Sequence, residues 1–293
     1  MASPIRVHVL RCGYMRVSEN VLYGNSINLN NSARQILSGD SGRVTLPVNA
    51  FLVEHPKGLF VIDTGWPRAI SPRGKYDEAA VRKQLPLHLA KLYRPWVPEG
   101  MALSEQLAAR GIRPEDIDCL ILTHFDPDHI GDLRQLRGAK RILVPEDEYY
   151  WTCRMVYRLR QPQHFYQGIP MERIWYRGDD FGPNRWVYDV LDDGTIRMVN
   201  VPGHTDGLAS VVISNGELLE HKERFVVLTS DAAFTPRNWE KMITPGLGFD
   251  PALQRRGLQW VQKQAAREGC LGVFTSHDPA LEPQTVEIPM LDH

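Results

Sequence analysis

Short apolar runs separated by turn residues occupy the first 65 positions of the chain. They lie at 6–10, 48–54 and 59–62, and a short Pro-Lys-Gly stretch separates the last two. Runs of this length that are bounded by Pro and Gly are typical of strands joined by a tight hairpin. The pattern therefore predicts an early strand followed by a strand hairpin.

Between the first two runs lies a long polar segment, 19–43, which is rich in Asn, Ser and Gly. It predicts an exposed loop or arm, and structureless loops of this length are commonly functional or contact a partner. An arm exchanged between two copies would give a homodimer. Only the length of the loop supports that expectation.

Helical and strand patterns alternate through the rest of the chain. Helices are expected at 77–85, 102–110, 132–136 and 251–268, and buried strands at 119–122, 141–144 and 272–275. Asp250 and Pro251 form an N-cap and first helical position, Leu258, Val261 and Ala265 share one face, and Gly269 follows as the stop. The alternation has no internal repeat and no low-complexity linker. It favours one layered α/β domain over 1–293, with helices outside the sheets.

Composition places the chain among globular proteins. Of 293 residues, 43% are apolar and 24% are charged, and Lys plus Arg (34) nearly balance Asp plus Glu (35) for a net charge of −1. This balance argues against a nucleic-acid partner, which needs clustered basic charge. No apolar run approaches the length of a membrane span, so we expect a cytoplasmic protein. Its four scattered cysteines predict neither a disulfide framework nor a thiolate zinc site.

The most informative stretch is a cluster of metal-binding residue types directly after the strand at 119–122. His124, Asp126, Asp128 and His129 fall within six residues. Imidazole and carboxylate suit divalent first-row metals, and four such ligands exceed what one tetrahedral ion needs once distant ligands join. Two metal ions are therefore the interpretation that we favour. The alternative is a solvated acidic turn with incidental histidines.

Three later apolar runs also end in a possible metal ligand. The run at 199–204 ends in His204, that at 225–231 in Asp231, and that at 272–277 in His277. Each ending alone could be a capped turn or a structural histidine. Together they place four ligand-bearing segments at the ends of strands.

These residues resemble the signature of the metallo-β-lactamase fold hydrolases, H-x-H-x-D-H followed by a later His, an Asp and a final His. The resemblance spans the chain and includes the Val-Ile-Asp-Thr-Gly segment at 61–65. The segments at Cys12, His204, Asp231 and His277 look most like the N-acyl homoserine lactonase branch. The resemblance implies an αββα sandwich of two mixed β-sheets flanked by helices, with the metals at one edge.

Carried over by position, the resemblance implies a set of site residues. One metal would be held by His124, Asp126 and His204, the other by Asp128, His129 and His277, and Asp231 would bridge them. Two ions a few ångström apart would hold a bridging hydroxide and polarise the oxygen of the carbonyl or phosphoryl group that it attacks. Asp128 would be a possible proton acceptor. Asp63 would not bind a metal itself but would orient a side chain that does. The alternative is that it caps the turn at Gly65.

The chain departs from the family at Asp126, where the second histidine is usual. With two divalent ions and a hydroxide, three carboxylates leave zero net charge at the centre, where the usual ligands leave a charge of +1. Zinc remains the first expectation. The harder ligand set predicts a greater tolerance for manganese or iron.

A second departure is Phe234, three residues after Asp231, where lactonases of this branch commonly present a tyrosine. Phenylalanine cannot donate a hydrogen bond to the substrate. Either another group, such as Tyr23 or Tyr150, supplies that bond, or the substrate is not a lactone.

Residues 149–188 form the most aromatic part of the chain, with eleven aromatic side chains and six arginines. We expect a cap-like insertion over the metals, in which Tyr150, Trp151 and Tyr157 line an apolar substrate pocket, close to Phe234, and arginine meets a polar or anionic group. The alternative is a small helical subdomain with its own aromatic core.

The leading functional hypothesis is a metal-dependent hydrolase that opens an ester or lactone bond in a small molecule, with N-acyl homoserine lactones as candidates. Two alternatives stay open on the same fold. One is a phosphodiester hydrolase, which aromatics interleaved with arginine could serve. The other is a non-hydrolytic di-iron binding or redox protein, because related di-iron proteins carry a carboxylate at the position of Asp126.

Overall fold

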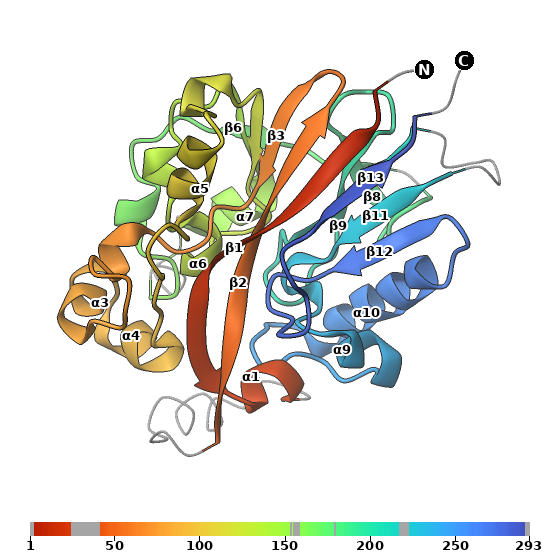
Figure 1. Ribbon diagram of the computed structural model, residues 1–293. Helices are drawn as coiled ribbons and strands as arrows, with labels where there is room; N and C mark the ends of the chain where they lie inside the picture. The colour runs from red at the N-terminus through yellow and green to blue at the C-terminus, as the bar shows by residue number, and fades with distance from the viewer. Residues whose placement is uncertain are drawn as a thin grey trace.

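Two β-sheets pack face to face and carry helices on their outer sides (Figure 1), as the computed structural model shows. The structure describes residues 3–24, 42–152, 154, 159–178, 180–216 and 223–290. Within them the first sheet has seven strands in the order β13-β1-β2-β3-β4-β5-β6, and the second has six in the order β12-β11-β10-β9-β8-β7.

The strands of the first sheet are β1 (Ile5–Ser18), β2 (Arg43–His55), β3 (Gly58–Ile62), β4 (Cys119–Ile121), β5 (Ile142–Pro145), β6 (Glu172–Ile174) and β13 (Thr285–Ile288). Those of the second are β7 (Arg177–Gly178), β8 (Trp186–Asp189), β9 (Ile196–Asn200), β10 (Ala209–Ser214), β11 (Phe225–Leu228) and β12 (Cys270–Phe274). The pairs β3/β4 and β11/β12 are parallel. Parallel neighbours end at the same edge of a sheet, which brings the loops that follow them together.

The helices complete a four-layer sandwich. They are α1 (Asn20–Tyr23), α3 (Glu78–Gln84), α4 (Leu87–Tyr93), α5 (Leu103–Ala109), α6 (Pro127–Ile130), α7 (Glu146–Thr152), α9 (Pro236–Lys241) and α10 (Pro251–Ala265). In Figure 1, α3, α4 and α5 lie outside the first sheet, and α9 and α10 outside the second. The predicted αββα arrangement of two mixed sheets flanked by helices is confirmed.

Three apolar cores hold these layers together. The middle core lies between the sheets and contains Val7, Phe51 and Val211. An outer core joins the first sheet to its helices around Trp66, and another joins the second sheet to α10 through Leu258. Alternate side chains of each strand therefore face opposite cores, because successive residues of a strand point to opposite sides of its sheet.

Several local expectations are corrected by the structure. The segment 19–43 is not wholly a loop, because α1 begins at Asn20; residues 25–41 lie outside the described residues, so the arm and its part in a homodimer stay predictions. The helix expected at 77–85 is confirmed as α3, and a further helix that was not expected, α4, begins directly after Pro86. The expected helix at 132–136 is a 3-10 turn at Leu133–Gln135. Ala265 is exposed, and Gln264 is buried in its place.

The aromatic segment 149–188 is less separate from the domain than its composition indicated. Its second half supplies β6 to the edge of the first sheet and β7 and β8 to the edge of the second. Phe165 and Tyr166 belong to the outer core of the first sheet, and Tyr176 to the middle core. These residues, which the sequence assigned to a cap or to a subdomain with its own core, therefore belong to the two main sheets and their cores. Among the described residues, no helix is long and apolar enough to cross a membrane.

Candidate metal centre

Every residue proposed as a metal ligand follows a strand and lies at one edge of the sandwich. Asp63 follows β3, and the stretch from His124 to His129 follows β4. From the second sheet, His204 follows β9, Asp231 follows β11 and His277 follows β12. All of these side chains are buried. Strand ends are rigid supports, so the donor atoms are held in place before any ligand binds.

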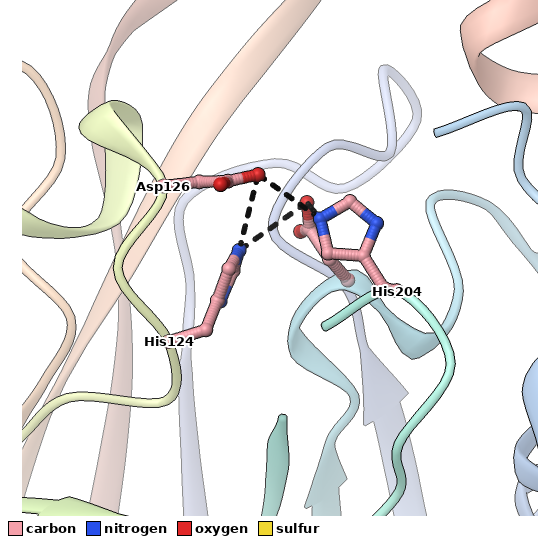
Figure 2. A group of neighbouring side chains, drawn as sticks. His124, Asp126 and His204 are labelled. Atoms are coloured by element: carbon pink, nitrogen blue, oxygen red, sulfur yellow. Dashed lines mark hydrogen bonds and ion pairs between the residues drawn. The ribbon is translucent and has the colours of Figure 1, made fainter. Parts of the chain in front are cut away.

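The first group of donors consists of His124, Asp126, His204 and Asp231, whose donor atoms all lie within 4.8 Å of one another. Figure 2 shows the side chains of His124, Asp126 and His204 pointing toward one another. The Nε2 atom of His204 lies 3.1 Å from Oδ2 of Asp126 and 3.2 Å from Oδ2 of Asp231. The Nε2 atom of His124 lies 3.6 Å from Oδ2 of Asp126.

The second group consists of Asp128, His129 and His277. Nε2 of His277 lies 3.4 Å from Oδ2 of Asp128, and Nε2 of His129 lies 3.8 Å from the same oxygen. The other oxygen of Asp231, Oδ1, lies 3.2 Å from His129 Nε2 and 3.1 Å from His277 Nε2. The carboxylate of Asp231 thus directs one oxygen to each group, as a bridging ligand would.

The hydrogen bonds behind these histidines select the tautomer that a metal requires. Nδ1 of His204 donates to the carbonyl of Leu247 at 2.6 Å, and Nδ1 of His277 donates to that of Pro47 at 2.9 Å. A carbonyl can only accept, so Nδ1 carries a proton, and in the neutral ring the lone pair of Nε2 faces the centre.

Several donor atoms at the centre are buried without a hydrogen-bond partner in the described part of the chain. They are Nε2 of His124, His129 and His277, and Oδ1 of Asp231. Buried polar atoms are nearly always satisfied, so a cluster of four that is not needs an explanation. Imidazole nitrogens with a free lone pair beside carboxylates are the donor set of a divalent metal site, and the residues present fit such ions.

Asp63 connects this centre to the first sheet. Its Oδ2 accepts from Nδ1 of His129 at 2.7 Å, and its Oδ1 accepts from the backbone of Thr123 at 2.9 Å. The residue has φ 59°, a left-handed conformation that aspartate tolerates better than most residues. The geometry supports the orienting hypothesis, since the carboxylate reaches His129 directly.

The carboxyl group of Asp126 is held ionised by positive neighbours. Burial opposes ionisation, but the guanidinium of Arg160, together with His124 and His204, keeps the pKa of Asp126 well below its usual range. Burial, and then His129, lower the pKa of His124 to about 4. His124 is therefore neutral near pH 7, as metal ligation requires.

Arg160 is a site residue that sequence reasoning did not single out. Its Nε and Nη2 bond both oxygens of Asp126 at 2.5 Å, and its Nη2 lies 2.6 Å from Nε2 of His204. The guanidinium also lies over the ring of Phe249, 5.3 Å from its centroid. The only sequence signal was the enrichment of arginine in 149–188, which does not distinguish one arginine from another.

Comparison with known proteins identifies the family. The family model of the metallo-β-lactamase superfamily matches residues 43–262, more than half of the chain. The chain belongs to the metallo-β-lactamase superfamily. The matched range includes the donors from His124 to Asp231, while His277 lies beyond it and joins the centre through β12.

Relatives of this superfamily protein include several N-acyl homoserine lactonases. AttM of Azorhizobium caulinodans is 28% identical over 301 residues, with 97% of each chain covered. AiiA of Bacillus thuringiensis subsp. kurstaki is 25% identical, with 80% of this chain and 82% of that protein covered. These relatives confirm the lactonase branch that the sequence motifs resemble.

Solved structures agree on the fold. An N-acyl homoserine lactone hydrolase with its product N-hexanoyl-L-homoserine bound at the catalytic metal centre has a TM-score of 0.70, 21% identity and 95% coverage of each chain. The hydrolase AbOPH has a TM-score of 0.58 at 19% identity, with 100% of this chain and 99% of that chain covered. At these identities the structures support the metallo-β-lactamase fold alone.

In this member of the superfamily, Phe234, which stands where a tyrosine was expected, packs against two of the proposed metal ligands. Phe234 is buried, and its ring packs against His277 at 5.0 Å and His204 at 6.0 Å between centroids. Tyr23 lies nearby, but its hydroxyl is hydrogen-bonded to Oγ1 of Thr235 at 3.0 Å.

The other residues expected to line a substrate pocket lie on or after α7. Tyr150 is 53% exposed. Trp151 is half-buried beneath the guanidinium of Arg154, which lies 4.1 Å from its ring centroid. Tyr157 lies outside the described residues. Their role in substrate binding stays a prediction.

Tyr93, at the end of α4, is a second residue that sequence reasoning missed. Burial, followed by the charges of Asp126 and Asp128, raises the pKa of its hydroxyl well above the usual value. Its other electrostatic neighbours are Arg160 and Asp231. The charges of the donor groups therefore reach the phenol of Tyr93. No signal in the sequence could predict this, because α4 itself was not expected.

Asp132, just after α6, provides a test of electrostatics near the centre. Its Oδ2 accepts from the backbone of Ser104 at 2.8 Å, while the buried Oδ1 has no hydrogen-bond partner among the described residues. Burial raises the pKa of this carboxyl to about 6. The folded state therefore binds the proton more tightly than the unfolded state, whose pKa is about 3.9.

We expect Asp132→Asn to stabilise the protein near neutral pH. In the wild type, the free energy of unfolding should fall by up to about 3 kcal/mol as the pH rises from about 4 to about 6. Asparagine removes this loss and can still accept the bond from Ser104. Urea unfolding at pH values of about 4.5 and about 7.5 would measure the difference. An effect of equal size at both pH values would contradict the prediction.

Proposed function

We propose that this protein is a metal-dependent hydrolase that opens an ester or lactone bond, with N-acyl homoserine lactones as the first candidate substrates. The observation that carries the proposal is that the buried Nε2 atoms of His124, His129 and His277, which have no hydrogen-bond partner among the described residues, converge with the carboxylate of Asp231 at the edge of the sandwich. The N-acyl homoserine lactonases among its relatives support the substrate class.

The residues divide into two positions for divalent ions. His124, Asp126 and His204 would hold one ion, and Asp128, His129 and His277 the other. Asp231 would contribute one oxygen to each. Zinc is the first candidate, with manganese or iron favoured by the carboxylate of Asp126. Bound there, the ions would activate a water for attack and polarise the carbonyl oxygen of the substrate.

The protein's own groups would orient the reaction. Asp63 holds the ring of His129 through Nδ1, and backbone carbonyls hold His204 and His277 in the same way. Such fixed donors need no rearrangement when the substrate reacts. Asp128, between His129 and His277, would accept the proton released by the attacking water.

A substrate panel tests this proposal. Purified protein with its metal content measured would be offered a series of lactones, a simple ester and bis-p-nitrophenyl phosphate in a pH-indicator assay. Turnover of lactones in preference to the phosphodiester is the expected result. Turnover of the phosphodiester alone would favour the phosphodiesterase alternative, and no turnover with a filled metal centre would favour a binding or redox role.

Tyr93 is the candidate for the hydrogen bond that Phe234 cannot donate. We expect Tyr93→Phe to lower kcat/KM for lactones about tenfold, the loss of one transition-state hydrogen bond, while the Tm stays near that of the wild type. Tyr23→Phe is the matched control, because the hydroxyl of Tyr23 is bonded to Thr235. A larger loss in Tyr23→Phe than in Tyr93→Phe would reverse the assignment.

A further inference from the structure

The side chain of Arg160 makes its bonds inside the first donor group. Nε bonds Oδ1 of Asp126 and Nη2 bonds Oδ2, both at 2.5 Å. The same Nη2 lies 2.6 Å from Nε2 of His204, and Nη1 donates to the backbone oxygen of His204 at 3.4 Å. One guanidinium thus contacts two of the three residues that belong to this group alone, Asp126 and His204.

The contact with His204 uses an atom that a metal ion would need. Because Nδ1 of His204 donates to the carbonyl of Leu247, Nε2 has one lone pair, and Nη2 of Arg160 lies on it. Oδ2 of Asp126 is likewise shared between Arg160 and His204. One lone pair cannot serve a donor N–H and a metal ion together, and two cations at this separation repel.

Arg160 is a permanent charge in this position. Burial works against ionisation, but Asp126 more than offsets it, so the pKa of the guanidinium lies above its usual value. Its side chain is only 19% exposed. Arg160 also supplies one positive charge at the position where a carboxylate replaces the usual neutral histidine, and so restores the charge that Asp126 removes.

The second donor group has no such competitor. In the described part of the chain, neither arginine nor lysine contacts Asp128, His129 or His277, whose charged partners are one another, Asp231 and, for His129, also Asp63. The two groups therefore differ in what an incoming cation must displace. At the second group it displaces no arginine or lysine side chain, and at the first it must displace Nη2 from His204 and from Oδ2 of Asp126.

We infer that Arg160 is a positioning residue that competes with the metal ion at His124, Asp126 and His204, so that the two groups fill in sequence. The group of Asp128, His129 and His277 fills first. The second ion binds when Nη2 withdraws from His204, while the Nε bond to Oδ1 of Asp126 keeps the arginine beside the centre. This inference rests on the metal centre proposed above.

Metal titration of the full-length protein tests the order of filling. After removal of metal with a chelator, zinc would be titrated calorimetrically into wild type and Arg160→Gln, with the final stoichiometry measured by mass spectrometry. In the wild type we expect two steps whose affinities differ at least about tenfold. In Arg160→Gln the weaker step should tighten by about tenfold or more, and the stronger step should change less than about threefold.

Two further variants make the result specific. Arg173→Gln removes an arginine of the same segment whose partner is Glu146, at 3.2 Å, and should leave both steps unchanged. Arg160→Lys keeps the charge but cannot bond both oxygens of Asp126 as a fork, and should tighten the weaker step less than Arg160→Gln. If Arg160→Gln fails to fold, as judged by circular dichroism, the comparison of Arg160→Lys with wild type decides.

An unchanged or weakened second step in the Arg160 variants would overturn the inference, because Arg160 would then support the ion rather than compete with it. Two steps of equal affinity in the wild type would overturn it as well. Failure of every variant to bind zinc, cobalt or manganese would overturn the proposed metal centre itself. The two failures are therefore distinguishable.

Discussion

Replacing Asp231 by asparagine should lower kcat/KM about a thousandfold and reduce the bound metal from two ions to one or fewer, because this carboxylate faces both donor groups. Asparagine has one acceptor oxygen instead of two and no charge. Its amide N–H would point at an Nε2 atom that must stay unprotonated to bind an ion. Steady-state kinetics on the best lactone, together with metal analysis of the same sample, would measure both effects.

Asp278→Asn is the matched control for this variant. Asp278 follows His277 directly, and its Oδ1 accepts from the backbone of Ala280 at the surface. Activity and metal content should stay within about threefold of the wild type, as expected for a surface substitution. An Asp231→Asn protein with two ions and near-normal activity would disprove the bridging role.

Asp63→Asn should weaken metal binding and lower kcat by about 10- to 100-fold, the usual effect of removing the partner behind a metal-binding histidine. The amide of asparagine can donate to Nδ1 of His129, which would move the ring proton to Nε2 and remove the lone pair that faces the centre. Competition with a zinc-specific chelator would measure the affinity, and the pH dependence of kcat would report the altered tautomer.

Asp116→Asn serves as the control for Asp63→Asn. Asp116 is paired with Arg113 at the surface, 2.8 Å away, and belongs to neither donor group. It should leave metal affinity unchanged. If Asp63→Asn bound metal as tightly as wild type, the carboxylate would be a turn cap, the alternative that its sequence position left open.

Local patterns predicted most of the framework correctly. The hairpin of β2 and β3, the strand β4 before His124 and the helix capped by Asp250 were all expected. Each depends on turn residues, caps and apolar runs that lie close together in the chain. The elements that were missed or misplaced, such as α4 and the strands β6 to β8, depend on partners far away in sequence.

The same distinction separates the parts of the candidate site. By itself the sequence determined which residues could bind metal, because imidazole and carboxylate side chains at strand ends are local features. Only the tertiary structure decided which Nε2 atoms converge, which oxygen of Asp231 faces each group, that Arg160 bonds Asp126, and that the charge of Asp126 raises the pKa of Tyr93. These relations join segments up to 230 positions apart, as between Pro47 and His277. They depend on how the two sheets pack, which no local pattern of residues specifies.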